Sequence, residues 1–264
     1  MNKTLAALCM ALLLAGCTAT GSGSGSREGA QQPTSSKPAE NEQQQRAKVH
    51  TELGSLYMLD GRYAIAMEEA RIALAADSNY APAYNLLGLV HMVLNEPRLS
   101  EDNFGMALRL APGDPEINNN YGWFLCQSGR EQRSIEYFMA AGKNPLYTTP
   151  SRPFTNAGIC AMRMKDDKAA EEYLGTALRL SPTNTQALFW LADLAYRKGR
   201  YAEARQLTTD IEKMVDPSAE VIWLALRIER KLGNRDAEAR YTSQLRRRFV
   251  GSPEHRALTQ GQYD

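Results

Sequence analysis

Four cysteines and three histidines carry the most reactive side chains of this 264-residue chain. They are Cys9, Cys17, Cys126, Cys160, His50, His91 and His255. Their spacings are unrelated, so no zinc motif can be assembled from them. None of the histidines has a partner motif for nucleophilic or acid–base catalysis, and the glycines do not form a phosphate-binding loop. The sequence therefore predicts no catalytic residue, no metal site, no cofactor and no small-molecule substrate.

The composition is typical of a well-packed globular chain. Apolar residues make up 43% and charged residues 23%, which argues against wholesale disorder. Thirty-one lysines and arginines oppose thirty aspartates and glutamates, giving a formal net charge of +1. A charge this close to zero provides no general field for nucleic acid, so we expect no nucleic-acid partner.

The first residues have the layout of a secretory signal, which we place at residues 1–16. Lys3 supplies a positive charge, residues 5–14 are apolar, and Ala15 and Gly16 are small residues before Cys17. The apolar run is shorter than the ~20 residues that a transmembrane helix needs. A cysteine directly after the cleavage position resembles the lipobox of bacterial lipoproteins, and an ordinary signal peptide with a chance cysteine is the alternative. The resemblance implies acylation of Cys17, and Thr18 after it implies sorting to the periplasmic side of the outer membrane.

Residues 17–46 follow as a polar segment rich in glycine, serine and glutamine. No hydrophobic periodicity runs through it, so it cannot bury enough apolar surface to offset the entropy of ordering. We expect this lipidated segment to be a flexible linker.

Small residues recur at intervals of 34 in the rest of the chain. Gly54, Gly88 and Gly122 are spaced by 34, Gly158 follows at 36, and Ala192 comes 34 later. A second series of mostly small residues lies twelve positions after the first, at Ala66, Ser100, Ser134, Ala170, Ala204 and Glu238. This pattern is typical of tetratricopeptide (TPR) repeats, each a pair of short helices. A generic helical bundle with accidental spacing is the alternative.

The spacing predicts an all-α fold, a TPR superhelix (α-solenoid) of six helix-turn-helix repeats over residues 47–252. The predicted repeats are 47–80, 81–114, 115–148, 151–184, 185–218 and 219–252, with two additional residues at 149–150. Leu226 and Glu238 replace small residues in the sixth repeat, as expected of a terminal repeat that caps the stack. Residues 253–264 remain as a C-terminal tail.

The first helix of each repeat lines the inner face of a TPR superhelix. The general TPR positions for that face select a partner-binding groove of Met58, Leu59, Asn85, Leu89, Met92, Asn119 and Trp123. Its leucine, methionine and aromatic side chains suit a partner helix or an extended segment. Asn85 and Asn119 occupy matching positions and are candidates to hydrogen-bond a bound peptide backbone. The alternative is that these side chains only complete packing between helices.

The same positions in the last two repeats are more basic. They place Tyr196, Arg197, Arg227, Arg230 and Lys231 on the inner surface. A charge run of this kind is usually a solvated helix end, which we favour over a dedicated site for an acidic ligand.

Residues 119–126, 144–150 and 156–160 go beyond the general TPR pattern. They resemble the middle repeats of the type IV pilus biogenesis/stability lipoproteins of the PilF/PilW type. The resemblance implies a pilotin-like role, in which an outer-membrane-anchored scaffold binds the type IV pilus secretin subunit and aids its localisation and multimer assembly. A general envelope adaptor for cell-wall or lipoprotein assembly machinery is the alternative. Either is a non-catalytic scaffold.

The family pattern includes both remaining cysteines, Cys126 and Cys160, on the first helices of consecutive repeats. In an oxidising periplasm a disulfide between them is reasonable if their Cα atoms come within about 7 Å. Two buried free thiols are the alternative.

Overall fold

The computed structural model describes residues 30–263, and every regular element in that range is helical. The elements are the 3₁₀ helix η1 (Thr34–Ser36) and the α-helices α1 (Glu42–Leu59), α2 (Tyr63–Ala76), α3 (Ala81–Val93), α4 (Pro97–Leu110), α5 (Pro115–Gln127), α6 (Glu131–Gly142), α7 (Ser151–Arg163), α8 (Asp167–Leu180), α9 (Thr185–Arg197), α10 (Tyr201–Met214), α11 (Ala219–Lys231), α12 (Arg235–Arg248) and α13 (Pro253–Gln260). The predicted signal peptide, Cys17 and the first part of the predicted linker lie outside the described residues.

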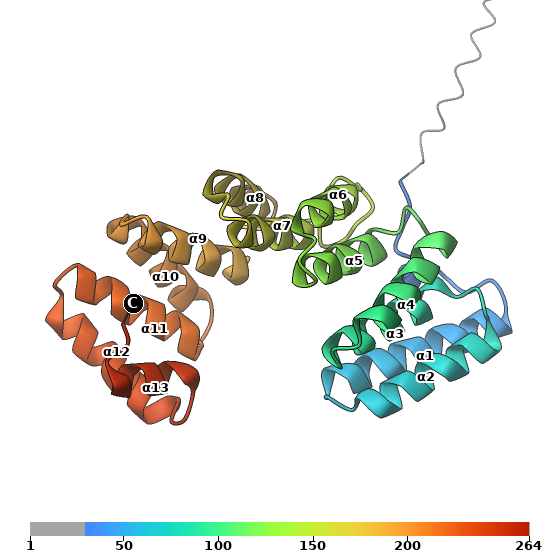
Figure 1. The fold of residues 1–264 in the computed structure, drawn as a ribbon, viewed down its shortest axis with the longest axis horizontal. Helices are drawn as coiled ribbons and strands as arrows, with labels where there is room; N and C mark the ends of the chain where they lie inside the picture. The colour runs from blue at the N-terminus through green and yellow to red at the C-terminus, as the bar shows by residue number, and fades with distance from the viewer. Residues whose placement is uncertain (1–29, 264) are drawn as a thin grey trace, which may run out of the picture.

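The first twelve α-helices form six successive pairs, each packed against the next. Helices α3, α5, α7, α9 and α11 begin at residues 81, 115, 151, 185 and 219, which are the first residues of predicted repeats. The pairs together describe an arch, with α1–α4 in one limb, α5–α8 across the crown and α9–α13 in the other limb (Figure 1). This all-α repeat architecture confirms the predicted fold class.

Close helix crossings explain the 34-residue series of small side chains. A Cβ atom at Gly122 would lie 2.9 Å from the ring of Phe138, and one at Gly158 would lie 2.5 Å from Cγ of Leu174. A larger residue at either position would push the two helices of its repeat apart. The large partners, Phe138 and Leu174, are fully buried in the space that the glycines leave.

The N-terminal segment differs from the predicted flexible linker within the described residues. Helix α1 begins at Glu42 rather than at residue 47, and residues 31–36 lie against the loops before α5 and α7. The backbone N–H of Thr34 donates to the Asp114 carboxylate at 2.6 Å, and the Asn144 side chain donates to the carbonyl of Gln31 at 2.8 Å. These polar contacts, rather than an apolar stripe, hold the segment, which is why hydrophobic periodicity does not reveal it.

The predicted C-terminal tail also contains a helix. In α13, Leu258 is buried against α11 and α12 in a cluster that includes Leu226 and Tyr241. Leu226 fills a place that small residues take in the other repeats. The last repeat therefore buries its outer surface under a thirteenth helix.

Candidate partner-binding groove

A groove of about 290 Å³ lies on the first repeats, and we call it the N-terminal groove. It is lined mainly by Lys48, Thr51, Ser55, Met58 and Leu59 of α1, by Pro82, Asn85, Leu86 and Leu89 of α3, and by Glu116 and Asn120 of α5. Four of the predicted groove residues, Met58, Leu59, Asn85 and Leu89, are among them. Leu59 is 79% exposed, so an apolar side chain at the rim is open to a partner.

Two predicted groove residues lie elsewhere. Met92 packs beside the aromatic cluster that contains Phe104 and Phe124. Trp123 packs against the cluster that contains both Cys126 and Cys160. Neither side chain lines the N-terminal groove, so their main contacts are between repeats.

Four asparagines form a hydrogen-bonded series across three repeats. The Asn156 amide donates to Asn119 at 3.0 Å, Asn119 donates to Asn120 at 3.3 Å, and Asn120 donates to Asn85 at 3.2 Å. Asn119 is 1% exposed, so it packs between helices instead of facing a bound peptide, which is the alternative that the sequence left open. Asn120 lines the groove beside Asn85 in its place.

Charged and polar groups surround the apolar floor of the groove. Lys48, Glu116 and Arg152 all contribute to its lining. Burial, followed by the carboxylates of Glu52 and Asp77, raises the pKa of Tyr80 to about 12. The shift keeps the Tyr80 hydroxyl neutral well above neutral pH, so Tyr80 adds no charge to the lining.

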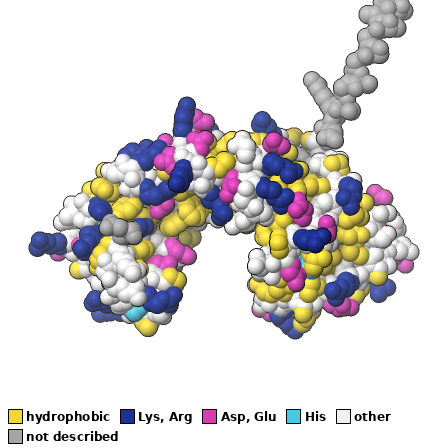
Figure 2. Space-filling model, in the orientation of Figure 1, with side chains coloured by type: hydrophobic (Ala, Val, Ile, Leu, Met, Phe, Trp, Pro, Cys, Tyr) yellow, Lys and Arg dark blue, Asp and Glu magenta, His cyan; other side chains and the backbone are white. Residues whose placement is uncertain are grey.

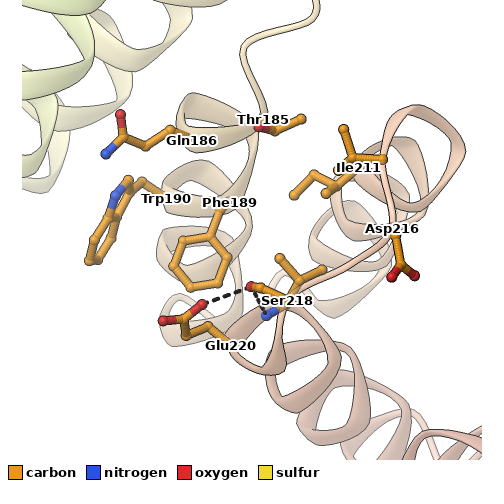
Figure 3. Close-up of a pocket in the computed structure, with 10 residues that line it drawn as sticks. Thr185, Gln186, Phe189, Trp190, Ile211, Asp216, Ser218 and Glu220 are labelled. Carbon is orange, nitrogen blue, oxygen red and sulfur yellow. Dashed lines mark hydrogen bonds between the residues drawn. The ribbon is translucent and has the colours of Figure 1, made fainter. Parts of the chain in front are cut away.

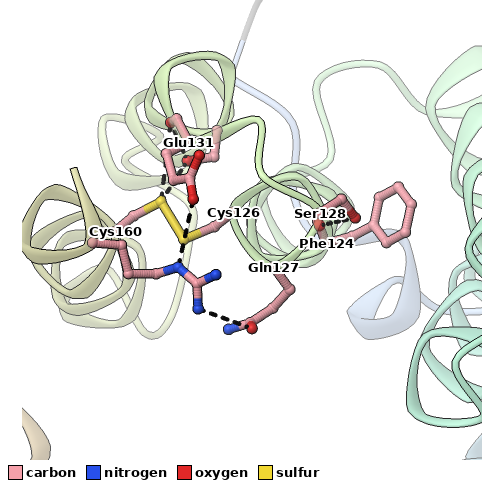
Figure 4. Close-up of polar contacts among 8 residues, drawn as sticks. Phe124, Cys126, Gln127, Ser128, Glu131 and Cys160 are labelled. Atoms are coloured by element: carbon pink, nitrogen blue, oxygen red, sulfur yellow. Dashed lines mark hydrogen bonds and ion pairs between the residues drawn. A yellow bond between two sulfur atoms is a disulfide. The ribbon is translucent and has the colours of Figure 1, made fainter.

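Cys126 of α5 and Cys160 of α7 are joined by a disulfide at the crown of the arch (Figure 4). Their Cα atoms are 6.0 Å apart, and neither residue is exposed. The Ser134 hydroxyl lies 3.1 Å from the sulfur of Cys160. This geometry supports the predicted bridge, which would cross the junction that contains the two additional residues.

A second cavity, of about 340 Å³, lies among α9, α10 and α11 (Figure 3). Phe189 and Trp190 of α9 line it and meet edge to face, with ring centroids 5.3 Å apart. Ser218 and Glu220 lie at the start of α11, where the serine hydroxyl donates to the carboxylate at 2.7 Å. Sequence reasoning did not select these residues, although Phe189 holds the same position in its repeat as Asn85 and Asn119 do in theirs.

Neither the N-terminal groove nor the second cavity contains a set of side chains arranged for catalysis. Among residues 30–263, no three histidine, cysteine, aspartate or glutamate side chains are placed to hold a metal ion. In the same range, no helix combines the length and the apolar character needed to cross a bilayer. The arch has a concave side, and Figure 2 shows the hollow between its two limbs. The fold and the grooves define a protein-binding repeat scaffold.

Comparison with known proteins identifies the family. A tetratricopeptide repeat model matches residues 161–221. The type IV pilus assembly protein PilF of Pseudomonas aeruginosa is 30% identical over 207 residues, which are 78% of this chain and 82% of PilF. The crystal structure of PilW, a type IV pilus biogenesis factor, superposes with a TM-score of 0.73 at 30% identity, covering 81% of this chain and 98% of PilW. A P. aeruginosa PilF structure gives the same TM-score at 28% identity, covering 84% of this chain and all of that one.

The chain therefore belongs to the PilF/PilW family of type IV pilus biogenesis TPR proteins. This confirms the resemblance found in the sequence. The chain is a scaffold rather than an enzyme.

Proposed function

We propose that this protein is a pilotin, a scaffold that binds the type IV pilus secretin subunit and aids its localisation and multimer assembly. The observation that carries the proposal is an open, apolar groove on the first repeats of a PilF/PilW-family chain. Met58, Leu59 and Leu89 present flexible or branched apolar side chains, which suit a partner helix or extended segment. Lipidation of Cys17, also proposed, would anchor the scaffold on the periplasmic side of the outer membrane.

Anchoring explains how modest affinity can suffice. A lipid at Cys17 would confine the groove to the membrane surface at which newly arriving secretin is assembled. The contact between the groove and secretin then forms at the high effective concentration that a tether provides. The proposed mechanism is capture by the groove and delivery by the anchor, with no covalent step.

Leu59→Asp tests the groove with little risk to the fold, because Leu59 is 79% exposed. Losing the burial of one leucine against a partner costs about 2 kcal/mol, roughly a thirtyfold loss in affinity. Leu56→Asp is the matched control, since Leu56 lies on the same helix, is 64% exposed and does not line the groove. Pull-downs from detergent-solubilised outer membrane should recover secretin with the wild type and Leu56→Asp, and much less with Leu59→Asp.

Two results would count against the proposal. Equal recovery of secretin by both variants would remove the N-terminal groove from the contact. Recovery of cell-wall enzymes or lipoprotein assembly proteins without secretin would favour a general envelope adaptor.

Cys17→Ser tests the anchor separately. This variant should keep its helical fold and its affinity for secretin in solution, yet lose membrane localisation and secretin multimers in cells. Membrane fractionation and a multimer gel measure the two effects. Normal multimer assembly by the Cys17→Ser form would contradict the proposed role of the anchor.

A further inference from the structure

The positions that the TPR register assigns to the inner face of the last two repeats have a chemistry of their own, and we call this surface the C-terminal groove. It consists of Phe189, Asp193 and Tyr196 of α9 and Glu220, Trp223, Arg227 and Arg230 of α11. Within each helix these residues are three or four positions apart, so they form one continuous face. Phe189 and Glu220 belong to the cavity of Figure 3, and the other five continue from it along the two helices.

An aromatic side chain already occupies this face. After α13 the chain turns at Gly261, and the ring of Tyr263 stacks on Trp223 with centroids 5.5 Å apart and planes 26° from parallel. The Arg230 guanidinium lies 4.0 Å from the centroid of the same tyrosine ring. Tyr263 is thus held between an indole and a cation, an arrangement that recognises aromatic groups.

Arg227 lies next to this aromatic position and lacks part of its hydrogen bonding. Its guanidinium is 4.8 Å from the Tyr196 ring centroid and 5.9 Å from that of Trp223. Its buried Nε has no hydrogen-bond partner, and its ion pair with Asp193 is long, at 3.9 Å. Asp193 is also held by Arg197 at 3.0 Å. A buried donor without an acceptor is costly, so a carboxylate from a ligand would bind favourably here.

Charge points to the same kind of ligand. Arg197 and Arg227 share the single carboxylate of Asp193, whereas Arg230 pairs with Glu238 at 2.8 Å. Because Asp193 is shared and its ion pair with Arg227 is long, Arg227 is incompletely neutralised, which favours an acidic segment over a basic one. The aromatic rings of Trp223 and Tyr196 favour an aromatic side chain. The guanidinium group of Arg227 beside them favours a ligand that has a carboxylate next to that aromatic residue.

We propose that the C-terminal groove is a second protein-binding site, which takes an extended segment carrying an aromatic side chain next to an acidic one. Tyr263 of the chain's own tail holds the aromatic position until such a segment displaces it. The site is separate from the N-terminal groove, so the arch can engage two segments at once. It does not depend on secretin being the partner of the first groove.

The test uses the tail as a probe. A fluorescein-labelled synthetic peptide with the sequence of residues 256–264 is titrated into the full chain and into a chain that ends at Gln260. The shortened chain keeps α13 but has lost the competing tyrosine. We expect the peptide to bind the shortened chain at least about tenfold more tightly than the full chain, because the native tail competes at a high effective concentration.

Changes in the peptide test the chemistry without altering the protein. Replacing the peptide's tyrosine by alanine should abolish binding to the shortened chain, whereas phenylalanine should preserve most of it. An amidated peptide with Asn in place of the final aspartate lacks both carboxylates and should bind about tenfold more weakly. In the shortened chain, Arg227→Gln should weaken the unmodified peptide, and Leu59→Asp in the other groove should not.

The proposal is overturned if the peptide does not bind the shortened chain, or binds both chains equally. It is also overturned if the alanine peptide binds as well as the tyrosine peptide. Circular dichroism checks that each protein variant is folded. The peptide variants need no substitution in the protein, so they test the proposal even where a protein variant unfolds.

Discussion

Single small side chains set the distance between the helices of each repeat. At Gly158 the neighbouring helix is so close that even a methyl group would overlap Leu174. Gly175 lies in α8 of the same repeat, yet the nearest group to its missing Cβ is the end of Arg179 at 3.6 Å, an ordinary contact. Two helical glycines of one repeat therefore carry different constraints.

Gly158→Ala and Gly175→Ala should shift stability in opposite directions. Overpacking at Gly158 costs about 1–3 kcal/mol, which outweighs the roughly 1 kcal/mol that alanine contributes through helix propensity. At Gly175 only the propensity gain remains, so that variant should be more stable by up to about 1 kcal/mol. Urea unfolding followed by circular dichroism measures both. A Gly158→Ala protein as stable as the Gly175→Ala protein would show that the crossing is looser than described.

Residue types in the repeats predict much of the fold but only part of the groove. The spacing of Gly54, Gly88 and Gly122 is enough to locate the helix pairs, because each glycine marks the same crossing. The same register selects Asn119, whereas its neighbour Asn120 lines the groove. Sequence position along a helix does not fix the small rotation between successive repeats, and that rotation decides which of two adjacent residues is covered.

Among the elements, α5 and α7 are joined by a covalent bond as well as by packing. The disulfide links the two helices across a sequence separation of 34 residues. Arg163 of α7 adds an ion pair to Glu131 at 3.6 Å and a hydrogen bond to Gln127 at 3.3 Å. Because a solenoid is stabilised mainly by contacts between neighbouring repeats, a covalent bond at this junction affects both limbs.

Opening the bridge should destabilise the protein. The loss of loop-closure entropy in the unfolded chain corresponds to about 3–4 kcal/mol for a loop of this length. Denaturant unfolding of the wild type with and without reductant measures it, and the Cys126→Ala, Cys160→Ala double variant should be insensitive to reductant. Alkylation of both Cys126 and Cys160 in non-reduced wild-type protein, found by mass spectrometry, would refute the bridge.

At the scale of the whole molecule, the N-terminal segment connects the start of the arch to its third helix pair and the loops on either side of that pair. Residues 31–36 make hydrogen bonds to the loop before α5, to the first turn of α5 and to the loop before α7. Asp114 is central to this attachment, since one carboxylate oxygen accepts from Thr34 and the other caps α5 through Glu116 and Ile117. The Thr34–Asp114 contact spans 80 residues of sequence and the Gln31–Asn144 contact spans 113, so no local pattern could have predicted them. The helix α13 escaped prediction for a similar reason, because Leu258 is buried only through its contact with a distant cluster.

Asp114→Ala should release the N-terminal segment. Loss of the cap costs about 1 kcal/mol of stability, and loss of the Thr34 contact should speed amide exchange in residues 31–37. Asn184→Ala is the control, because Asn184 caps α9 through Ala187 but does not touch the segment. Hydrogen–deuterium exchange with mass spectrometry compares the two. Equal protection of residues 31–37 in both variants would mean that other contacts hold the segment.

The place where the chain joins the crown also sets how far the scaffold can stand from a bilayer. If Cys17 carries the lipid, the covalent path from it to Gln31 is fourteen residue steps, at most about 50 Å when fully extended. This contour length is a ceiling on the height of the crown, while the two limbs extend to either side of it. A partner that lies beyond this height and beyond the reach of the limbs would be out of range. Inserting residues before Gln31 would then work as a molecular ruler for the depth at which assembly takes place.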